Sequence, residues 1–367
     1  MVGYSLNNIL KKPTKVNTNN KLVFFRKKLL NIPSKTNFLY SPSFFCYNNI
    51  NNQYIINNNM TKDIKSEIRK AYLLNKYVII TPGRAKRPRD VKEETIIKRS
   101  SECPFCPENI NDENITDQIK INGKWRVLSI KNIFPAVTLD NDKAYGTQEV
   151  IIENRDHSKE MSDLNERQIK NVLKMYAKRT KEISKNEKID YVLCFKNQGS
   201  KAGASIIHAH SQIFASHILP PDVHEELGLA TSYKIEKHSC PYCDIIKKEM
   251  NSPRKIWENK FACAIAPYAS EYHYEAWIFT KRHIDNITNC NEQELDSLAA
   301  ALKKILVKLK KLDLSFNFYM HQVISDKNQH FYIKIQPRDS VCAGVELGSG
   351  LVINSVPPEV ASEYYRE

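Results

Sequence analysis

Two short stretches, Cys103-Pro104-Phe105-Cys106 and Cys240-Pro241-Tyr242-Cys243, decide how this chain is organised. Each stretch is followed by a β-like run, a histidine, a long amphipathic helix, a second β-like run and a second histidine. The histidines of the two sets are His157 with His208 and His283 with His330. A set of features that recurs in the same order indicates a duplicated structural unit.

The elements inside each copy predict a helix packed on an antiparallel sheet, which is an α+β fold. Asp163 with Glu166 is a plausible capping pair for the first helix, and Asn291 with Glu294 serves the second. Apolar residues at helical spacing follow both pairs, with Lys and Arg on the opposite faces. The expected strands are 149–153 and 191–195 in the first copy, and 275–279 and 316–320 in the second.

The distribution of charge suggests three segments. Residues 1–62 contain eight Lys, one Arg and no acidic residue, so they carry +9 of the net charge of +14. The same stretch holds 14 Asn, a composition typical of a poorly ordered extension. We therefore expect an extension over 1–62 and domains over 63–218 and 219–367. An organelle transit peptide is the alternative to a cytoplasmic protein with a low-complexity extension.

Each copy offers two cysteines and two histidines, a ligand set that suits tetrahedral zinc. The first set is Cys103, Cys106, His157 and His208, and the second is Cys240, Cys243, His283 and His330. Four protein ligands leave no open position, so both sites are predicted to be structural. Unrelated surface or core cysteines would be a reasonable alternative for one pair, but two copies in matching context favour metal.

One position breaks the repeat and points to chemistry. The first copy reads His208-Ala209-His210, whereas the corresponding stretch of the second is His330-Phe331-Tyr332. Residues two apart on a strand face the same way, so a metal can hold His208 while His210 faces a pocket. A histidine there can attack phosphorus and form a covalent nucleotidyl intermediate.

The run Gly203-Ala204-Ser205 through His210 and Gln212 resembles the galactose-1-phosphate uridylyltransferase family, in the histidine-triad superfamily. The resemblance covers residues 75–366 and implies two histidine-triad-like units with His210 as the nucleophile. The cofactor expected from the ligand sets is zinc, at two structural sites. The substrate-binding residues that it implies are Arg84, Arg87, Asn132, Asn197, Ser205, Gln212, Glu346 and Asn354.

Departures from the best-known members bear on the substrate. Those enzymes carry an acid after the Asn that corresponds to Asn132, and here the next residue is Ile133. The sequence around His210 is more similar to that of the ADP-glucose phosphorylase branch, whose members move AMP from ADP-glucose to phosphate. The resemblance thus predicts a nucleotide sugar as donor, with a hexose 1-phosphate or phosphate as acceptor.

Two other functions stay open at this point. Diadenosine-polyphosphate phosphorylases and hydrolases use the same histidine chemistry. A zinc-containing nucleic-acid-binding module is the alternative without catalysis, but the basic charge lies mostly in 1–62, so no nucleic-acid partner is expected. No apolar run is long enough to span a membrane. The oligomeric state is open, with a homodimer among the options.

Overall fold

The computed structural model describes residues 66–82, 103–339 and 342–367. The predicted extension over 1–62 and the predicted phosphate ligands Arg84 and Arg87 lie outside these residues. Among the described residues, no helix combines the length and the apolar character needed to cross a membrane.

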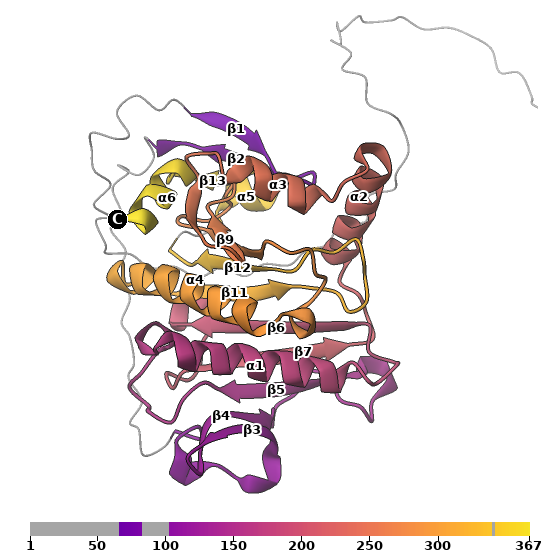
Figure 1. Ribbon diagram of the computed structural model, residues 1–367, viewed down its shortest axis with the longest axis vertical. Coiled ribbons are helices and arrows are strands. Elements are labelled where there is room, and N and C mark those ends of the chain that lie inside the picture. Colours follow the sequence, from indigo (N-terminus) through magenta and orange to yellow (C-terminus); the bar gives the residue numbers. More distant parts are fainter. Residues whose placement is uncertain (1–65, 83–102, 340–341) are drawn as a thin grey trace, which may run out of the picture. The chain divides into compact units, whose positions relative to one another are not determined.

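A ten-stranded antiparallel sheet forms the centre of the fold (Figure 1). Its strand order is β3-β4-β5-β7-β6-β11-β12-β10-β9-β8. The strands are β3 (Ile115–Ile121), β4 (Lys124–Lys131), β5 (Gly146–Ile152), β6 (Tyr191–Gln198), β7 (His210–Ser216), β8 (Lys255–Glu258), β9 (Ala262–Ile265), β10 (Ala276–Thr280), β11 (Phe316–His321) and β12 (Tyr332–Pro337). All four strands expected from the sequence are present.

The two halves of this order correspond strand by strand. From one edge the strands are β3, β4, β5, β7 and β6, and from the other edge they are β8, β9, β10, β12 and β11. The two halves meet where β6 pairs with β11, and there Phe195 lies opposite Tyr319 and Asn197 opposite Asn317. An antiparallel pairing about that point relates the two copies by an approximate twofold rotation. The duplication predicted from the cysteines and histidines is therefore present, and its two copies share one continuous sheet.

Two long helices cover one face of this sheet and lie side by side (Figure 1). They are α1 (Glu166–Ile183) and α4 (Glu292–Lys311). The Lys170 ammonium joins them by ion pairs to Glu292 and Asp296, at 3.0 and 2.6 Å. Their apolar faces share one buried core with the strands of both copies.

The capping of these helices agrees with the sequence in one copy and not in the other. Asn291 and Glu294 form the predicted capping box of α4. In the first copy the N-cap is Asn165, not Asp163, because a separate 3₁₀ turn over Met161–Asp163 precedes the helix. The Asn165 side chain accepts a hydrogen bond from the Gln168 backbone N–H at 2.9 Å.

Smaller elements complete the fold. The remaining helices are α2 (Pro221–Lys237), α3 (Pro241–Glu249), α5 (Gly344–Ser349) and α6 (Pro358–Arg366). A second sheet, in the order β1-β2-β13, contains β1 (Glu67–Lys70), β2 (Tyr77–Ile80) and β13 (Val352–Asn354). The predicted division at residue 218 falls between β7 and α2, and the separation into two domains stays a prediction.

Candidate active site

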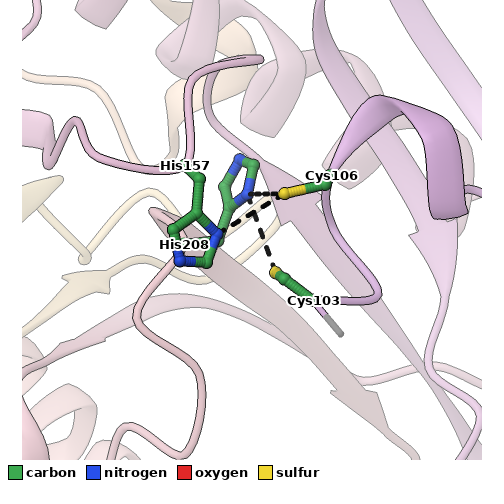
Figure 2. Close-up of side chains that lie close together, drawn as sticks. All are labelled: Cys103, Cys106, His157 and His208. Atoms are coloured by element: carbon green, nitrogen blue, oxygen red, sulfur yellow. Dashed lines mark hydrogen bonds between the residues drawn. The ribbon is translucent and has the colours of Figure 1, made fainter. Parts of the chain in front are cut away.

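The first cysteine–histidine set converges in space (Figure 2). The Sγ atom of Cys106 lies 3.5 Å from Nδ1 of His157 and 3.7 Å from Nδ1 of His208, and Sγ of Cys103 lies 3.8 Å from the same His208 nitrogen. All four ligand atoms lie within 4.8 Å of one another. This arrangement joins the segment before β3, the loop after β5 and the residues before β7.

The second set has the same geometry. Sγ of Cys243 lies 3.6 Å from Nδ1 of His283 and 3.5 Å from Nδ1 of His330, and Cys240 completes the group. The two sets of four side chains therefore occupy equivalent places in the two copies.

The other ring nitrogens of these histidines show why the geometry suits a metal. Nε2 of His208 lies 3.0 Å from the Asn154 carbonyl oxygen, and Nε2 of His330 lies 2.8 Å from that of Thr280. Each carbonyl belongs to the residue three places before the first histidine of its set. A carbonyl that accepts from Nε2–H leaves Nδ1 as the free ligand atom, which is the usual support of a metal-bound histidine. Each Cys₂His₂ set can therefore hold a metal ion.

His210 is the first residue of β7, and its ring is positioned by the backbone before it. Nδ1 lies 2.9 Å from the His208 carbonyl oxygen, so an Nδ1–H donor leaves Nε2 with its lone pair free. The ring is buried, at 8% exposure, with its centroid 5.0 Å from that of Phe105. The pKa of His210 is lowered to about 4, mainly because the ring is buried and to a smaller extent because the Lys196 ammonium is near. The imidazole is therefore neutral at pH 7.

His208 and His210 do not stand together on one strand, contrary to what the sequence led us to expect. The strand begins only at His210, and His208 stands in the irregular segment before it. The separation of roles comes from the carbonyl of His208, which accepts from the His210 ring, and not from two side chains on one strand face.

Sequence reasoning missed two charged residues that lie under His210. The Lys196 ammonium donates to the His210 carbonyl oxygen at 2.9 Å and to the Glu153 carboxylate at 3.0 Å. Both side chains are almost completely buried. A lysine inside the apolar run of β6 was the available signal, since lysine is almost never fully buried without a partner.

Three predicted phosphate-side residues lie near this strand. Gln212 is half-buried on β7 and pairs across the strands with Val150 and Phe195. Asn197 lies further along β6, where its side-chain oxygen accepts from the Asn317 amide at 2.8 Å. Ser205 is exposed in the segment between β6 and β7. Their roles toward a substrate stay predictions.

The remaining predicted substrate residues lie elsewhere in the fold. Asn132 follows β4, and its side chain accepts from the Phe134 backbone N–H at 2.9 Å. Glu346 lies on α5, where it accepts from the Ala343 N–H at 2.8 Å. Asn354 is fully buried at the end of β13, and its amide bonds the backbone of Ser270, Tyr272 and Val356. Asn132 and Glu346 thus stabilise their own turns, whereas Asn354 joins the end of β13 to the segment before β10.

The second copy has Tyr332 at the position of His210. The cross-strand pair Ile152–His210 corresponds to Phe279–Tyr332, and the next pair, Val150–Gln212, corresponds to Trp277–Lys334. The hydroxyl of Tyr332 donates to the Glu226 carboxylate of α2 at 2.8 Å.

The cavity beside this second position has a volume of about 40 Å³ and is lined by Tyr72, Lys76, Trp277 and Lys334, among others. That space is small beside the several hundred Å³ of a typical ligand pocket. Among the described residues, the imidazole that stands next to a Cys₂His₂ set with one ring nitrogen free is His210 of the first copy.

Comparison with known proteins identifies the family of the chain. A family model described as galactose-1-phosphate uridyl transferase, N-terminal domain, matches residues 57–220. ADP-glucose phosphorylase of Arabidopsis thaliana is 30% identical over 329 residues, which cover 82% of this chain and 92% of that protein. Galactose-1-phosphate uridylyltransferase of Thermotoga maritima is 27% identical over 321 residues, covering 82% of this chain and 98% of that protein.

Solved structures show the same relationship. The crystal structure of the Arabidopsis thaliana ADP-glucose phosphorylase with bound ADP-glucose superposes with a TM-score of 0.73 at 30% identity, covering 83% of this chain and 99% of that one. The fold expected from the resemblance is thus confirmed. The chain belongs to the galactose-1-phosphate uridylyltransferase family of nucleotidyltransferases.

Proposed function

We propose that this enzyme moves a nucleoside monophosphate from a nucleotide sugar to phosphate or a sugar 1-phosphate, through a covalent adduct on Nε2 of His210. The observation that carries the proposal is the His210 ring itself. It is buried and neutral, and the hydrogen bond from Nδ1 to the His208 carbonyl directs the lone pair to Nε2.

The reaction has two displacements. Nε2 of His210 attacks the α-phosphorus of the donor, a P–N bond forms, and the bond to the bridging oxygen breaks, so that the sugar 1-phosphate leaves with the electron pair. An oxygen of the acceptor then attacks the same phosphorus, and the P–N electron pair returns to Nε2. Gln212 and Ser205 are the residues we expect to bind the phosphate oxygens.

We propose zinc for the two Cys₂His₂ sets, because thiolate and imidazole ligands suit that ion. Four protein ligands complete its coordination, so each ion would hold segments of the chain together and supply no step of the transfer. In the first copy, the zinc would fix the segment that leads into His210.

We propose ADP-glucose as donor and phosphate as acceptor. The relative with 30% identity is named an ADP-glucose phosphorylase. This chain also has Ile133 where the resemblance leads us to expect an acid that meets the ribose of a uridine nucleotide. The uridylyltransferase reaction is the second candidate, supported by the relative from Thermotoga maritima.

The test uses donors labelled in the α-phosphate and no acceptor. Separate reactions contain ADP-glucose, UDP-glucose and diadenosine tetraphosphate, and acid-labile label on the quenched chain is measured. We expect label from ADP-glucose, discharged by phosphate to give labelled ADP. Label only from UDP-glucose, discharged only by a hexose 1-phosphate, would make the enzyme a uridylyltransferase. No label from any donor would contradict the covalent mechanism.

A further inference from the structure

A buried ion pair spans the strand that carries His210. Glu153 follows β5 and Lys196 lies on β6, and β7 runs between these two strands. The Lys196 ammonium reaches across to the Glu153 carboxylate at 3.0 Å and also donates to the His210 carbonyl at 2.9 Å. The backbone carbonyl of His210 is therefore bound by a charged hydrogen-bond donor.

Polar side chains continue beside this pair. Ser211, the residue after His210, accepts a hydrogen bond from the Tyr176 hydroxyl of α1 at 2.6 Å. The backbone carbonyl of Glu153 accepts from the Gln168 side chain at 2.7 Å. The helix α1 thus contacts Ser211 and Glu153, next to this ion pair.

The second copy provides an internal comparison. The cross-strand pairs Phe195–Gln212 and Tyr319–Lys334 correspond, so Lys196 matches Met320 and Ser211 matches Ile333. The pairs Ile152–His210 and Phe279–Tyr332 correspond in the same way.

Two further matches follow. Glu153, the residue after Ile152, matches Thr280. Tyr176 and Leu302 both stand eleven residues after their N-caps, so they match as well. The second copy therefore has Thr, Met, Ile and Leu, all fully buried, where the first has Glu, Lys, Ser and Tyr.

The comparison of the two copies indicates that the fold does not require the Glu153–Lys196 ion pair. The second copy forms the same sheet, helix and Cys₂His₂ set without the ion pair. A buried ion pair is also seldom worth more to stability than apolar side chains of similar size. In addition, Oε1 of Glu153 is buried with no hydrogen-bond partner among the described residues, which costs stability. The ion pair is present in the copy that has His210 and absent from the copy that has Tyr332 at the same position.

We propose that Glu153 and Lys196 are positioning residues, which fix the His210 backbone so that Nε2 stays aligned with the α-phosphorus. They do not touch the substrate in this assignment, and they act through the His210 carbonyl. The inference rests on the proposed function, since it concerns the geometry of the adduct-forming step.

The test replaces the pair with the residues that the second copy uses, Glu153→Thr together with Lys196→Met. Because the second copy folds with Thr280 and Met320, we expect the variant to unfold cooperatively and to keep its full metal content. Adduct formation from labelled ADP-glucose in a single turnover should be slower by about 10- to 100-fold, the size of effect that a displacement of about 1 Å can produce. The donor concentration for half-maximal rate should change little.

Two further variants sharpen this test. Glu153→Gln keeps an acceptor for Lys196, so it should retain most of the wild-type rate. The control is Glu249→Thr with Arg254→Met, which removes another buried ion pair (2.9 Å) and should leave the rate unchanged.

A wild-type rate in the Glu153→Thr, Lys196→Met variant would overturn the inference. Loss of metal or of cooperative unfolding in that variant would also overturn it, because the ion pair would then be required for folding. If the unmodified enzyme itself forms no adduct, it is the proposed function that fails.

Discussion

At the scale of single residues, His210 and Tyr332 occupy the same position in two copies of one fold, yet they do different things. His210 has a neutral ring with one nitrogen bound to a carbonyl and the other free. Tyr332 is fully buried and its hydroxyl is bound to Glu226. Among the described residues, an imidazole with one ring nitrogen left free beside a Cys₂His₂ set is therefore found at His210 and not at the matching position of the second copy.

We expect His210→Ala to lower turnover by at least about 10⁴-fold, because the group that forms the covalent bond is lost. The metal content should stay at the wild-type value, since His210 is not one of the Cys₂His₂ ligands. Turnover and zinc are measured on the same preparation.

The matched control is Tyr332→Phe. It removes the hydrogen bond to Glu226 and should cost about 1 kcal/mol of stability while turnover stays at the wild-type rate. Adduct formation that persists in His210→Ala would show that another residue is the nucleophile.

The sequence predicts these residues unevenly. The two ligand sets could be predicted because cysteines and histidines recur at matching places in the two copies, and His210 because it stands where the second copy has Tyr332. Lys196 stands out in the apolar run of β6, but its pairing with Glu153 could not be predicted, because that pairing depends on β7 running between their strands, and strand order is set by packing. The cap of α1 was assigned to Asp163 because nothing in the local pattern separates it from Asn165, and only the preceding 3₁₀ turn decides.

At the scale of elements, each Cys₂His₂ set ties together segments that are distant in the chain. In the second copy, Cys240 and Cys243 lie at the start of α3, His283 follows β10 and His330 precedes β12. A metal bound there contributes its binding energy to folding, because the unfolded chain has no such site.

We therefore expect Cys240→Ser to lose one metal ion per chain and at least about 2 kcal/mol of stability, or roughly 4–8 °C in Tm. Adduct formation at low temperature should persist, because the altered set belongs to the copy without the nucleophile. Metal analysis, thermal unfolding and labelling are the three measurements. Cys290→Ser, which removes a cysteine outside both sets, is the control and should keep both metals. Unchanged metal content in Cys240→Ser would contradict the assignment of this set.

At the scale of the whole molecule, the described residues form two copies of one unit, and the proposed nucleophile lies in the first copy. The palindromic strand order and the pairing of β6 with β11 join the copies into one sheet. The second copy contributes β11, which pairs with β6, the strand of Lys196 and Asn197, and so it supports the half that contains His210. The duplication was evident from the sequence, but the joining of the copies at β6 and β11 was not, because no local motif marks that edge.

The last prediction concerns the order of events in the whole catalytic cycle. If His210 carries the nucleotide, as proposed, the sugar 1-phosphate leaves before the acceptor attacks. Initial rates measured over both substrates should give parallel lines in double-reciprocal plots, as expected for ping-pong exchange.

The same mechanism predicts a partial reaction: labelled glucose 1-phosphate should enter ADP-glucose in the absence of phosphate, since the first displacement is reversible and needs no acceptor. His210→Ala should abolish this exchange. Intersecting lines together with no exchange would mean that donor and acceptor react directly in a ternary complex, and the histidine adduct would then be wrong even if the substrates were right.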